Sequence, residues 1–358
     1  MKVLVTGAGG FIGKNLVDRL NSLQHEVYCF TREVSHEQLD KWCADCEFVF
    51  HLAGANRPET EDEFMTVNCG LTEQLCELLD KHKNKCTVLY SSSIQAELDN
   101  PYGRSKLAAE KILKKRDTKT MIYRLPNVFG KWTKPAYNSV VATFCYNTAN
   151  GLPLRIDAPD KELRLVYIDD VVSEMIRAME SGETGTVEPI YTVTLGRLAE
   201  LLGQFKKNRD TKCISLMRGF EKKLYAMYTS YLPEDEFDYS VITHRDERGS
   251  FTELFKSDDR GQVSINIIKP GIVKGNHYHH TKNEKFVVVS GNGVVRFRKV
   301  GTDKVIEYRV SGDDIRIVDI PCGYTHNIEN IGTDDMSVVM WCNECFDPEN
   351  PDTYYLEV

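Results

Sequence analysis

The pattern of apolar residues changes in the last third of the chain, and this change constrains the fold more than any other feature. From Met1 to about Tyr191, short apolar segments such as VLVTGA and EVYCF alternate with helical patterns such as FIGKNLVDRLNSL. From about Ser240, short segments such as VSINII, KFVVVSG and SVVMW alternate with Gly, Asp and Asn turns. The first pattern predicts βαβ units around a parallel sheet, and the second predicts an all-β sandwich or barrel.

Two domains are expected in a chain of 358 residues, and the acidic segment PEDEFDYS separates the two patterns. We therefore predict an α/β domain over residues 1–240, with a Rossmann-like, doubly wound parallel sheet, and an all-β domain over residues 241–358.

Charge, hydropathy and cysteine content narrow the class of protein. A net charge of -8 argues against nucleic acid or an anionic membrane as the main partner. No apolar run approaches the roughly 20 residues that cross a bilayer, and the N-terminal KVLV is typical of a strand, not of a signal peptide. The 11 cysteines are scattered, mostly in apolar segments, which indicates reduced thiols in a cytoplasmic protein. Two CxxC pairs, Cys43/Cys46 and Cys342/Cys345, fall in different predicted domains, so we interpret their spacing as chance.

Three glycines follow the first predicted strand and open a helix. Gly7, Gly10 and Gly13 form GxxGxxG, which permits a tight turn and lets a pyrophosphate approach backbone N–H groups at the helix N-terminus. The second strand, EVYCF, is followed by Arg32 where an NAD site usually has an acid. An arginine there suits a 2′-phosphate, so we predict NADPH as the cofactor.

A tyrosine and a lysine lie on adjacent turns of one predicted helix. Tyr102 and Lys106 have YxxxK spacing and follow serines 91–93 at a strand end. A cation beside a phenol lowers the pKa of the phenol, so such a tyrosine can exchange a proton with a carbonyl or carbinol oxygen near neutral pH. A serine hydroxyl can hold the same oxygen.

Together, TGAGGFIG, HLAG, Asn68, the serine run, YGRSK, RLPNVFG and VYIDDVV resemble the extended short-chain dehydrogenase/reductase family over about residues 1–240. The resemblance implies that Tyr102 is the catalytic acid/base, that Lys106 binds the nicotinamide ribose, and that Ser93, or else Ser92, positions the substrate oxygen. Asn127 would face the sugar nucleotide. The implied cofactor-binding residues are Gly7, Gly10, Phe11, Ile12, Gly13, Arg32, Leu52, Ala53, Gly54, Tyr102 and Lys106.

The residues after the serine run bear on the reaction type. Members of this family with 4,6-dehydratase activity usually have an acidic pair there, whereas this chain has Ile94-Gln95-Ala96. This difference argues against dehydration. Reduction of a ketone and a 4-epimerase cycle both stay open.

The segment from Gly271 to Gly291 matches the first cupin motif at every spacing, and Pro321 to Asn330 matches the second motif except for one glycine. The resemblance predicts a cupin barrel in which His277, His279, Glu284 and His326 bind one divalent metal. Imidazole and carboxylate ligands suit Zn, Fe, Ni or Mn, and zinc is our first choice.

The same segment, with DERGSFTELFK before it, also resembles the metal-free cupin epimerases that act on 4-keto-6-deoxy sugar nucleotides. That resemblance makes His277 a catalytic base and makes Lys285 the residue that helps to hold an enolate. His277 is therefore a base, a ligand or neither.

Over essentially the full length, details such as PNVFGKW, GNHYHHTKNEKF, IPCGYTHNIEN and PDTYYLEV resemble the bifunctional capsular-polysaccharide enzymes of the CapF type. These are homodimers that form UDP-2-acetamido-2,6-dideoxy-L-talose on the way to UDP-N-acetyl-L-fucosamine. Their cupin domain, which carries zinc, epimerises C3 of a UDP-linked 4-keto-6-deoxy amino sugar, and their reductase domain then reduces C4 with NADPH. Two alternatives are a single-activity reductase or 4-epimerase with a structural cupin, and a non-catalytic NADPH sensor.

Overall fold

The structure is a computed structural model that describes residues 1–56, 60, 62–215 and 217–358. The chain forms two compact units. The first comprises residues 1–204 and 217–234, and the second comprises residues 205–216 and 235–358. The sequence-based boundary lies at residue 240, and the pattern contains no sign that residues 205–216 cluster with the second unit.

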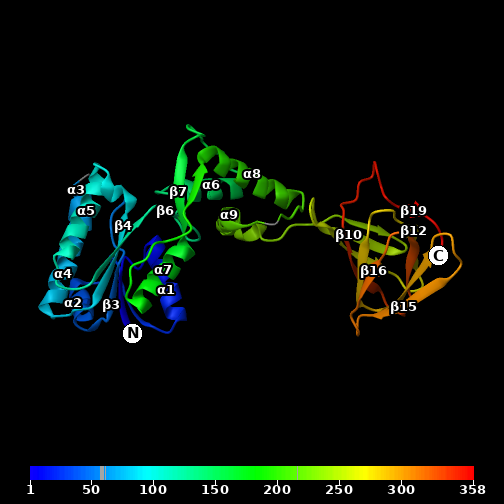
Figure 1. Cartoon of the computed structure of the whole chain (residues 1–358), viewed down its shortest axis with the longest axis horizontal. Helices are drawn as coiled ribbons and strands as arrows, with labels where there is room; N and C mark the ends of the chain where they lie inside the picture. Colours follow the sequence, from blue (N-terminus) through cyan, green and yellow to red (C-terminus); the bar gives the residue numbers. More distant parts are fainter. Residues whose placement is uncertain (57–59, 61, 216) are drawn as a thin grey trace. The chain divides into compact units, whose positions relative to one another are not determined.

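A sheet of five parallel strands forms the centre of the first unit. In spatial order its strands are β2 (Glu26–Phe30), β1 (Lys2–Thr6), β3 (Phe48–His51), β4 (Thr87–Ser93) and β5 (Thr120–Leu125). Helices cover both faces (Figure 1): α1 (Phe11–Ser22) and α7 (Ile168–Ser181) on one, and α2 (His36–Asp45), α4 (Leu71–Lys81) and α5 (Pro101–Lys114) on the other. This arrangement confirms the predicted α/β fold. The strand order reverses between β1 and β3, and open sheets of this kind bind ligands beyond the carboxyl ends of the strands at that point.

The apolar periodicity of the helices explains how they pack on this sheet. In α4 the buried residues Thr72, Leu75, Cys76 and Leu79 recur at intervals of three and four, so they form one stripe. The stripe joins a buried cluster that includes Leu4 of β1 and other strand residues. The carboxyl ends of the strands are thereby held on a rigid base.

A smaller sheet and several helices complete the first unit. The small sheet contains β6 (Asn127–Phe129), β7 (Glu162–Tyr167) and β8 (Tyr191–Thr194). Among the described residues, the remaining helices are α3 (Asp62–Met65), α6 (Val140–Ala149), α8 (Leu195–Asp210), α9 (Gly219–Thr229), the π-helical turn η1 (Thr66–Gly70) and the 3-10 turns η2 (Ile94–Glu97) and η3 (Glu234–Glu236). The end of α8 and most of η3 fall in the second unit. In the part of the chain that the structure describes, no helix combines the length and apolar character that crossing a bilayer requires.

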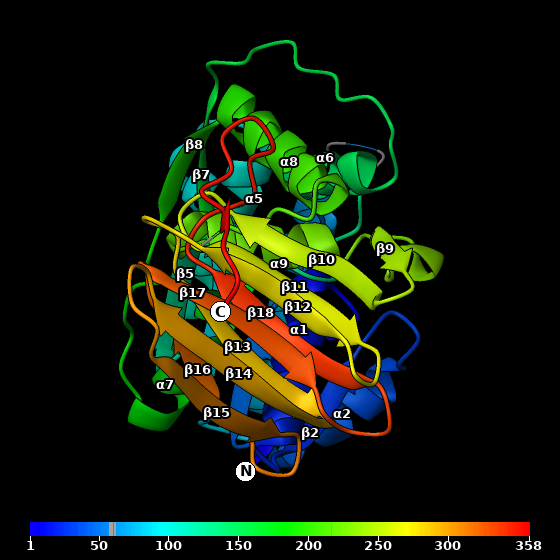
Figure 2. The ribbon, with the colours of Figure 1, turned by 90° about the vertical axis from the view of Figure 1, so that its right-hand side faces the viewer.

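The second unit is built from two antiparallel sheets, as the second sequence pattern predicts. The six-stranded sheet, most of which is visible in Figure 2, has the order β16 (Ile317–Ile320), β13 (Glu284–Ser290), β18 (Met336–Cys342), β11 (Gly261–Ile268), β10 (Gly249–Ser257) and β9 (Thr243–Asp246). The five-stranded sheet has the order β15 (Val305–Ser311), β14 (Asn292–Lys299), β17 (Tyr324–Asn330), β12 (Val273–Tyr278) and β19 (Tyr354–Tyr355).

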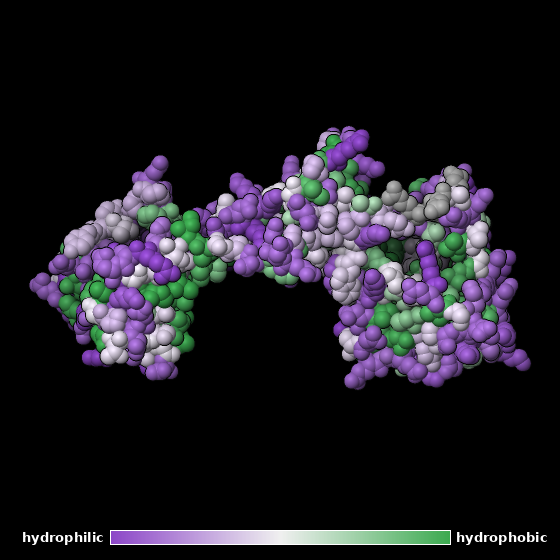
Figure 3. Space-filling model, turned by 180° about the vertical axis from the view of Figure 1, so that it is seen from behind, coloured by the Kyte–Doolittle hydropathy of each residue, from purple (hydrophilic) through white to green (hydrophobic). Residues whose placement is uncertain are grey.

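Alternate residues of these strands face the space between the two sheets. Phe286 and Val288 of β13, Phe297 of β14 and Ile328 of β17 are buried in one apolar cluster there. Polar residues of these strands that occupy inward-facing positions therefore also point into the space between the two sheets. On the outside, apolar and polar residues are mixed (Figure 3), and the exposed apolar ones include Ile317, at 66%.

Asn330 links the two sheets through hydrogen bonds to three backbone groups. Its fully buried amide nitrogen donates to the carbonyls of Ile268 and Asp334, each at 2.8 Å, and its amide oxygen accepts from the Gly332 N–H at 2.9 Å. These bonds fix the end of β17, whose last residue is Asn330.

The first prediction concerns this linkage. We expect Asn330→Ala to destabilise the second unit by roughly 2–4 kcal/mol, because three backbone groups lose their partner in a buried place. Calorimetric unfolding of the variant measures the loss. The matched control is Asn292→Ala on the exposed start of β14, which should change stability by less than about 0.5 kcal/mol. Equal stability of the two variants would contradict the assigned role.

Candidate functional site

The turn between β1 and α1 has a backbone path that only glycine allows. Gly7 has φ 71°, and a Cβ at this residue would lie 2.7 Å from the backbone nitrogen of Ala53. A Cβ at Gly13 would lie 2.2 Å from the carbonyl oxygen of Gly7. Helix α1 begins at Phe11, and Gly10 offers no side chain to cap it. The first-turn N–H groups of α1, including that of Ile12, therefore suit an anionic group such as a phosphate.

A chain of buried hydrogen bonds joins this turn to the HLAG segment after β3. The Ala53 N–H donates to the Thr6 hydroxyl, which lies 2.7 Å from Nδ1 of His51. Nε2 of His51 lies 2.8 Å from the Thr72 hydroxyl, which itself donates to the Asn68 carbonyl. Because Thr72 donates to that carbonyl, it accepts from Nε2–H of His51, and the Nδ1 atom accepts from Thr6. Burial lowers the pKa of His51 to about 3, so the ring is neutral.

The series of hydrogen bonds continues from Asn68 to the start of α5. The Asn68 amide bonds both backbone groups of Ala55 and donates to the Ser105 hydroxyl at 2.9 Å. Ser105 in turn donates to the carbonyl of Tyr102 at 2.7 Å. The HLAG loop and the helix that carries the predicted catalytic pair are thereby fixed together. The sequence motif pointed to Asn68, but nothing in it indicated Thr6, Thr72 or Ser105.

Tyr102, Ser93 and Lys106 come together as the sequence predicts. Tyr102 lies in the first turn of α5, and the Ser93 side chain at the end of β4 hydrogen-bonds it. Lys106, one turn later, has its Nζ atom 5.9 Å from the centre of the Tyr102 ring and donates to the carbonyl of Ser91 at 2.9 Å. A phenol, a hydroxyl and a buried ammonium group therefore share one place beyond the sheet.

The pKa values of this group differ in part from our expectation. Burial raises the pKa of Tyr102, although the hydrogen bond from Ser93 acts in the opposite direction. Burial lowers the pKa of Lys106 to about 8. The net shift is opposite to the one that a neighbouring cation alone would give, because burial is its largest cause. A raised pKa keeps the phenol protonated near pH 7, which suits a proton donor.

Ser92, the second candidate for holding a substrate oxygen, is occupied elsewhere. Its hydroxyl donates to Oε1 of Glu110 at 2.6 Å. Glu110 is almost fully buried and forms two charge-assisted bonds with Arg124, at 2.8 and 2.7 Å. Ser93 is therefore the serine that the structure places at Tyr102. The Glu110–Arg124 pair was not indicated by the sequence, and it anchors α5 to β5.

The other predicted residues of the first unit lie at the surface of the same end or close to it. Arg32 is exposed directly after β2, and no ion pair of its side chain occurs among the described residues. Leu52 and Gly54 flank Ala53 in the loop after β3. Asn127 is the exposed first residue of β6 and donates to the carbonyl of Arg164 at 3.3 Å.

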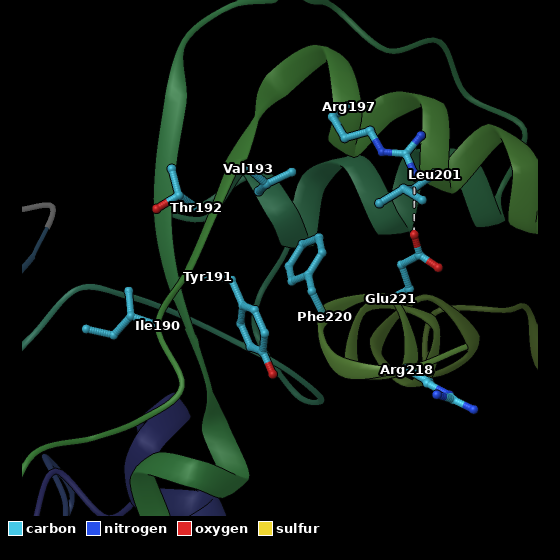
Figure 4. Close-up of a pocket in the computed structure, with 9 residues that line it drawn as sticks. All are labelled: Ile190, Tyr191, Thr192, Val193, Arg197, Leu201, Arg218, Phe220 and Glu221. Atoms are coloured by element: carbon cyan, nitrogen blue, oxygen red, sulfur yellow. Dashed lines mark hydrogen bonds and ion pairs between the residues drawn. The ribbon is translucent and has the colours of Figure 1, made fainter. Parts of the chain in front are cut away.

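A hollow of about 460 Å³ lies beside β8, α8 and α9 (Figure 4). The rings of Tyr191 and Phe220 line it, with centroids 5.4 Å apart. Its arginines are not free to meet an anion inside it, because Arg197 pairs with Glu221 at 3.3 Å and Arg218 is directed away from the two rings. We assign no ligand to this hollow.

In the second unit the predicted ligand set is gathered in the space between the two sheets. Ligand atoms of His277, His279, Glu284 and His326 all lie within 4.8 Å of one another. His277 and His326 oppose each other on β12 and β17, and Glu284 begins β13 of the other sheet. Nε2 of His326 and Nε2 of His279 lie 3.3 and 3.4 Å from Oε2 of Glu284.

This cluster has the chemistry of a divalent metal site. Nε2 of His279, Oε2 of Glu284 and both ring nitrogens of His326 are buried without a hydrogen-bond partner. Such atoms are costly to bury unless an ion satisfies them. Burial would raise the pKa of Glu284, but the neighbouring rings of His279 and His326 hold it well below its usual range. Burial lowers the pKa of His277 to about 4. At pH 7 Glu284 is therefore ionised and His277 neutral, which are the states that metal ligands require.

A residue near the C-terminus orients this cluster. Nδ1–H of His279 donates to the carbonyl of Asp352, which leaves Nε2 to face Glu284. The Asp352 carboxylate accepts from the backbone N–H groups of His280, Thr281 and Lys282 and from the Thr281 hydroxyl, at 2.7 to 3.2 Å. Burial would raise the pKa of Asp352, but these bonds hold it well below its usual range. Asp352 therefore fixes the loop between β12 and β13. Sequence motifs missed it because it lies far from the ligands along the chain.

Lys285 does not face the cluster, so the prediction that it shares a site with His277 is wrong. It follows Glu284 in β13, and successive side chains of a strand point to opposite faces of the sheet. Lys285 accordingly pairs with Asp319 of β16 on the outer face. The two CxxC pairs lie in different units, and Cys342 of the second pair is the cross-strand neighbour of Glu284.

The second prediction concerns the charge of Lys106. Its folded-state pKa of about 8 lies below the value near 10.4 of an unfolded lysine, so the buried charge costs on the order of 3 kcal/mol below pH 8. We expect Lys106→Met to unfold at a higher temperature than wild type at pH 7. This gain should shrink between about pH 8 and 10.5, where the folded protein loses the proton and the unfolded chain keeps it.

Thermal unfolding over this pH range measures the effect. Lys111→Met, at an exposed position of the same helix, is the matched control and should show no such pH dependence. A Lys106→Met variant that is less stable than wild type at pH 7, with the same deficit at pH 10, would contradict the assignment.

Comparison with known proteins places both units in families. Residues 3–194 match the NAD dependent epimerase/dehydratase family, and residues 244–354 match the polysaccharide biosynthesis C-terminal domain. A protein of Pseudomonas aeruginosa described as UDP-2-acetamido-2,6-beta-L-arabino-hexul-4-ose reductase is 46% identical over 368 residues, which cover 100% of this chain and 99% of that protein.

Solved structures agree with these matches. The capsular polysaccharide assembling protein CapF from Staphylococcus aureus has a TM-score of 0.94 and 49% identity, and the match covers 100% of both chains. UDP-glucose 4-epimerase from Thermotoga maritima, at 20% identity and a TM-score of 0.54, covers 64% of this chain and shares the fold. The matches confirm the family that the sequence motifs indicate. The chain therefore belongs to the CapF-type family, in which an NAD dependent epimerase/dehydratase domain precedes a polysaccharide biosynthesis C-terminal domain.

Proposed function

We propose that this chain is a bifunctional enzyme of nucleotide-sugar metabolism that supplies a polysaccharide. Its second unit, a cupin, epimerises C3 of UDP-2-acetamido-2,6-dideoxy-4-hexulose, and its first unit reduces the C4 ketone to give UDP-2-acetamido-2,6-dideoxy-L-talose, a precursor of UDP-N-acetyl-L-fucosamine. The observation that carries the proposal is that Tyr102, Ser93 and Lys106 lie together in the unit that has a glycine turn before α1. No side chain caps the N-terminus of that helix. The full-length relative named as a UDP-hexulose reductase supports the choice of substrate.

The first unit fits a nicotinamide dinucleotide. The uncapped start of α1 and the turn that a Cβ at Gly7 or Gly13 would fill suit a pyrophosphate. Arg32 is exposed and without an ion pair in the described part of the chain, so it suits the 2′-phosphate of NADPH. When bound, the cofactor would supply the hydride that C4 receives.

The residues of this site supply the proton and hold the substrate oxygen. Tyr102, protonated because of its raised pKa, donates its proton to the C4 oxygen as that oxygen becomes an alkoxide. The Ser93 hydroxyl donates a second hydrogen bond to the same oxygen. The Lys106 ammonium group beside the ring stabilises the phenolate that remains. Asn127 is our proposal for a contact with the sugar nucleotide.

The second unit fits a divalent metal, with zinc as our first choice. His279, Glu284 and His326 would hold it through the atoms that are buried without a partner. When bound, the metal would supply Lewis acidity to the space between the sheets. Two roles fit His277, the fourth ligand or the base on C3, and a neutral imidazole serves both.

The order of the two reactions follows from the chemistry of the ketone. A carbonyl at C4 acidifies the hydrogen at C3, because the carbanion that forms is an enolate. After reduction of C4 that hydrogen is no longer acidic, so epimerisation comes first. A cytoplasmic location and a homodimer complete the proposal, and both rest on the family resemblance.

The third prediction separates the two activities. We expect Tyr102→Phe to lower the rate of substrate-dependent NADPH oxidation by about 100-fold or more, because the proton donor is lost. Exchange of the C3 hydrogen with deuterated water should stay at the wild-type rate, since the second unit is unchanged. Tyr146→Phe, at a partly exposed position of α6, should leave both rates unchanged. Reduction by Tyr102→Phe at the wild-type rate would refute the assignment of Tyr102.

The fourth prediction concerns the metal and its orientation by Asp352. We expect Asp352→Asn to weaken zinc binding about 10- to 100-fold, because the loop that carries His279 loses its charged acceptor. Competition with a chromogenic chelator measures the affinity. Asp347→Asn, on the same C-terminal segment, is the matched control. His326→Ala should retain no stoichiometric metal, and full metal content in that variant would exclude the ligand set.

His277→Ala in the same assay distinguishes the two roles of His277. Lost metal identifies a ligand, whereas retained metal with lost C3 exchange identifies the base.

A further inference from the structure

Lys274 reaches across the space between the two sheets of the second unit. Its Nζ atom donates to the side-chain oxygen of Asn266 at 2.7 Å and to the carbonyl of Ile267 at 3.3 Å. Lys274 belongs to β12 of the five-stranded sheet, and both partners belong to β11 of the six-stranded sheet. The ammonium group therefore lies between the sheets, at the level of Ile328, two positions along β17 from His326.

A bulge in β12 places Lys274 on the same face as His277. The two residues are three positions apart along the chain, which in a regular strand would put them on opposite faces. The register of β12 shifts between Gly275 and His277, where Asn276 has φ 59°. Lys274 consequently opposes Ile328, and His277 opposes His326 two residues earlier on β17. A β-bulge of this kind re-aims a side chain, and here it brings a cation to the ligand face.

The surroundings of Lys274 leave its charge available. Both of its partners are neutral oxygens, and in the described part of the unit no carboxylate comes within ion-pair distance of it. Lys285, by contrast, pairs with Asp319 on the outer face, and Asp246 is bonded to Arg248 at 2.6 Å.

Polar side chains line one side of the interior around Lys274, and Ile328 of the apolar cluster lies opposite it. Gln262, Ser264 and Asn266 of β11 are buried at alternate positions facing it. Lys274 and His277 are only partly buried, whereas His279, Glu284 and His326 are buried. Burial lowers the pKa of Lys274, which is the direction expected of a cation that has given up water without a paired anion.

We propose that Lys274 is a catalytic residue of the epimerase site, where its ammonium group binds the C4 oxygen of the 4-keto sugar and stabilises the negative charge that develops there. The inference rests on the proposed epimerisation. A base takes the C3 proton, the C3–H electron pair forms the C3–C4 double bond, and the carbonyl pair moves to the C4 oxygen. Lys274 keeps its proton and donates a hydrogen bond to this oxygen. A proton derived from water then returns to the other face of C3, and nothing is oxidised or reduced.

Deuterium incorporation at C3 measures this step alone. The full-length, metal-loaded protein is incubated with UDP-2-acetamido-2,6-dideoxy-4-hexulose in deuterated water without NADPH, and proton NMR follows the C3 signal. We expect Lys274→Met to lower the exchange rate at saturating substrate by about 100-fold, a loss typical of a missing oxyanion donor. Substrate affinity, measured by calorimetry, should change much less, because the charge on oxygen develops only during reaction. The matched control is Lys285→Met on the outer face, which should exchange as wild type does.

Lys274→Arg separates charge from a structural role. It keeps the cation and should retain clearly more exchange than Lys274→Met, while metal content and melting temperature are measured for each variant. Exchange by Lys274→Met within about threefold of wild type overturns the proposal. So does an equal loss in the Met and Arg variants when both are folded and metal-loaded. If wild type itself shows no exchange, the proposed epimerisation is refuted, and the proposed role of Lys274 is refuted with it. A loss of exchange confined to the Lys274 variants is a different result, because wild type then still epimerises.

Discussion

The buried hydrogen bonds from Ala53 through Thr6, His51 and Thr72 to Asn68 are the constraint on which the first unit's site depends. Loops at the carboxyl ends of parallel strands have no ladder to fix them, so side chains must do so. The links from Thr6 through His51 and Thr72 to Asn68 are buried, so breaking one leaves a polar group without water and without a partner. The neutral His51 at the centre can accept on one side and donate on the other, which allows one ring to connect two threonines. The series of hydrogen bonds reaches Ser105, which bonds the Tyr102 carbonyl. It therefore fixes the position of α5, the helix that carries Tyr102 and Lys106.

The second unit depends on a different constraint, in which polar groups are buried without partners. The four candidate ligands face one another between two sheets whose remaining interior is largely apolar. Asp352 and the bulge at Asn276 hold this arrangement, one by charge and one by backbone geometry. Both proposed sites therefore contain buried polar groups that lower the stability of the fold: Lys106 in the first unit and the ligand cluster in the second. Such a cost is common at functional sites.

Much of the fold and of the site could be predicted, because the signals are local. The apolar periodicity gave the parallel sheet and the antiparallel sheets, and motif spacing located the glycine turn, Tyr102 with Lys106, and the ligand cluster. Other features depend on tertiary structure and had no local signal. A single bulge residue, Asn276, decides that Lys274 faces the interior, and the regular alternation after Glu284 turns Lys285 outward. The raised pKa of Tyr102 depends on how deeply the ring is buried, which spacing does not encode.

One carbonyl links the two proposed reactions, because it acidifies C3–H in the cupin and then receives hydride in the reductase. Joining both catalysts in one chain raises the effective concentration of the intermediate at the second site. The most direct test is NMR of the product that the wild-type protein forms from UDP-2-acetamido-2,6-dideoxy-4-hexulose with NADPH in deuterated water. Our account predicts one deuterium at an inverted C3, together with a hydroxyl and protium at C4. A product reduced at C4 that keeps protium and the original configuration at C3 would contradict it.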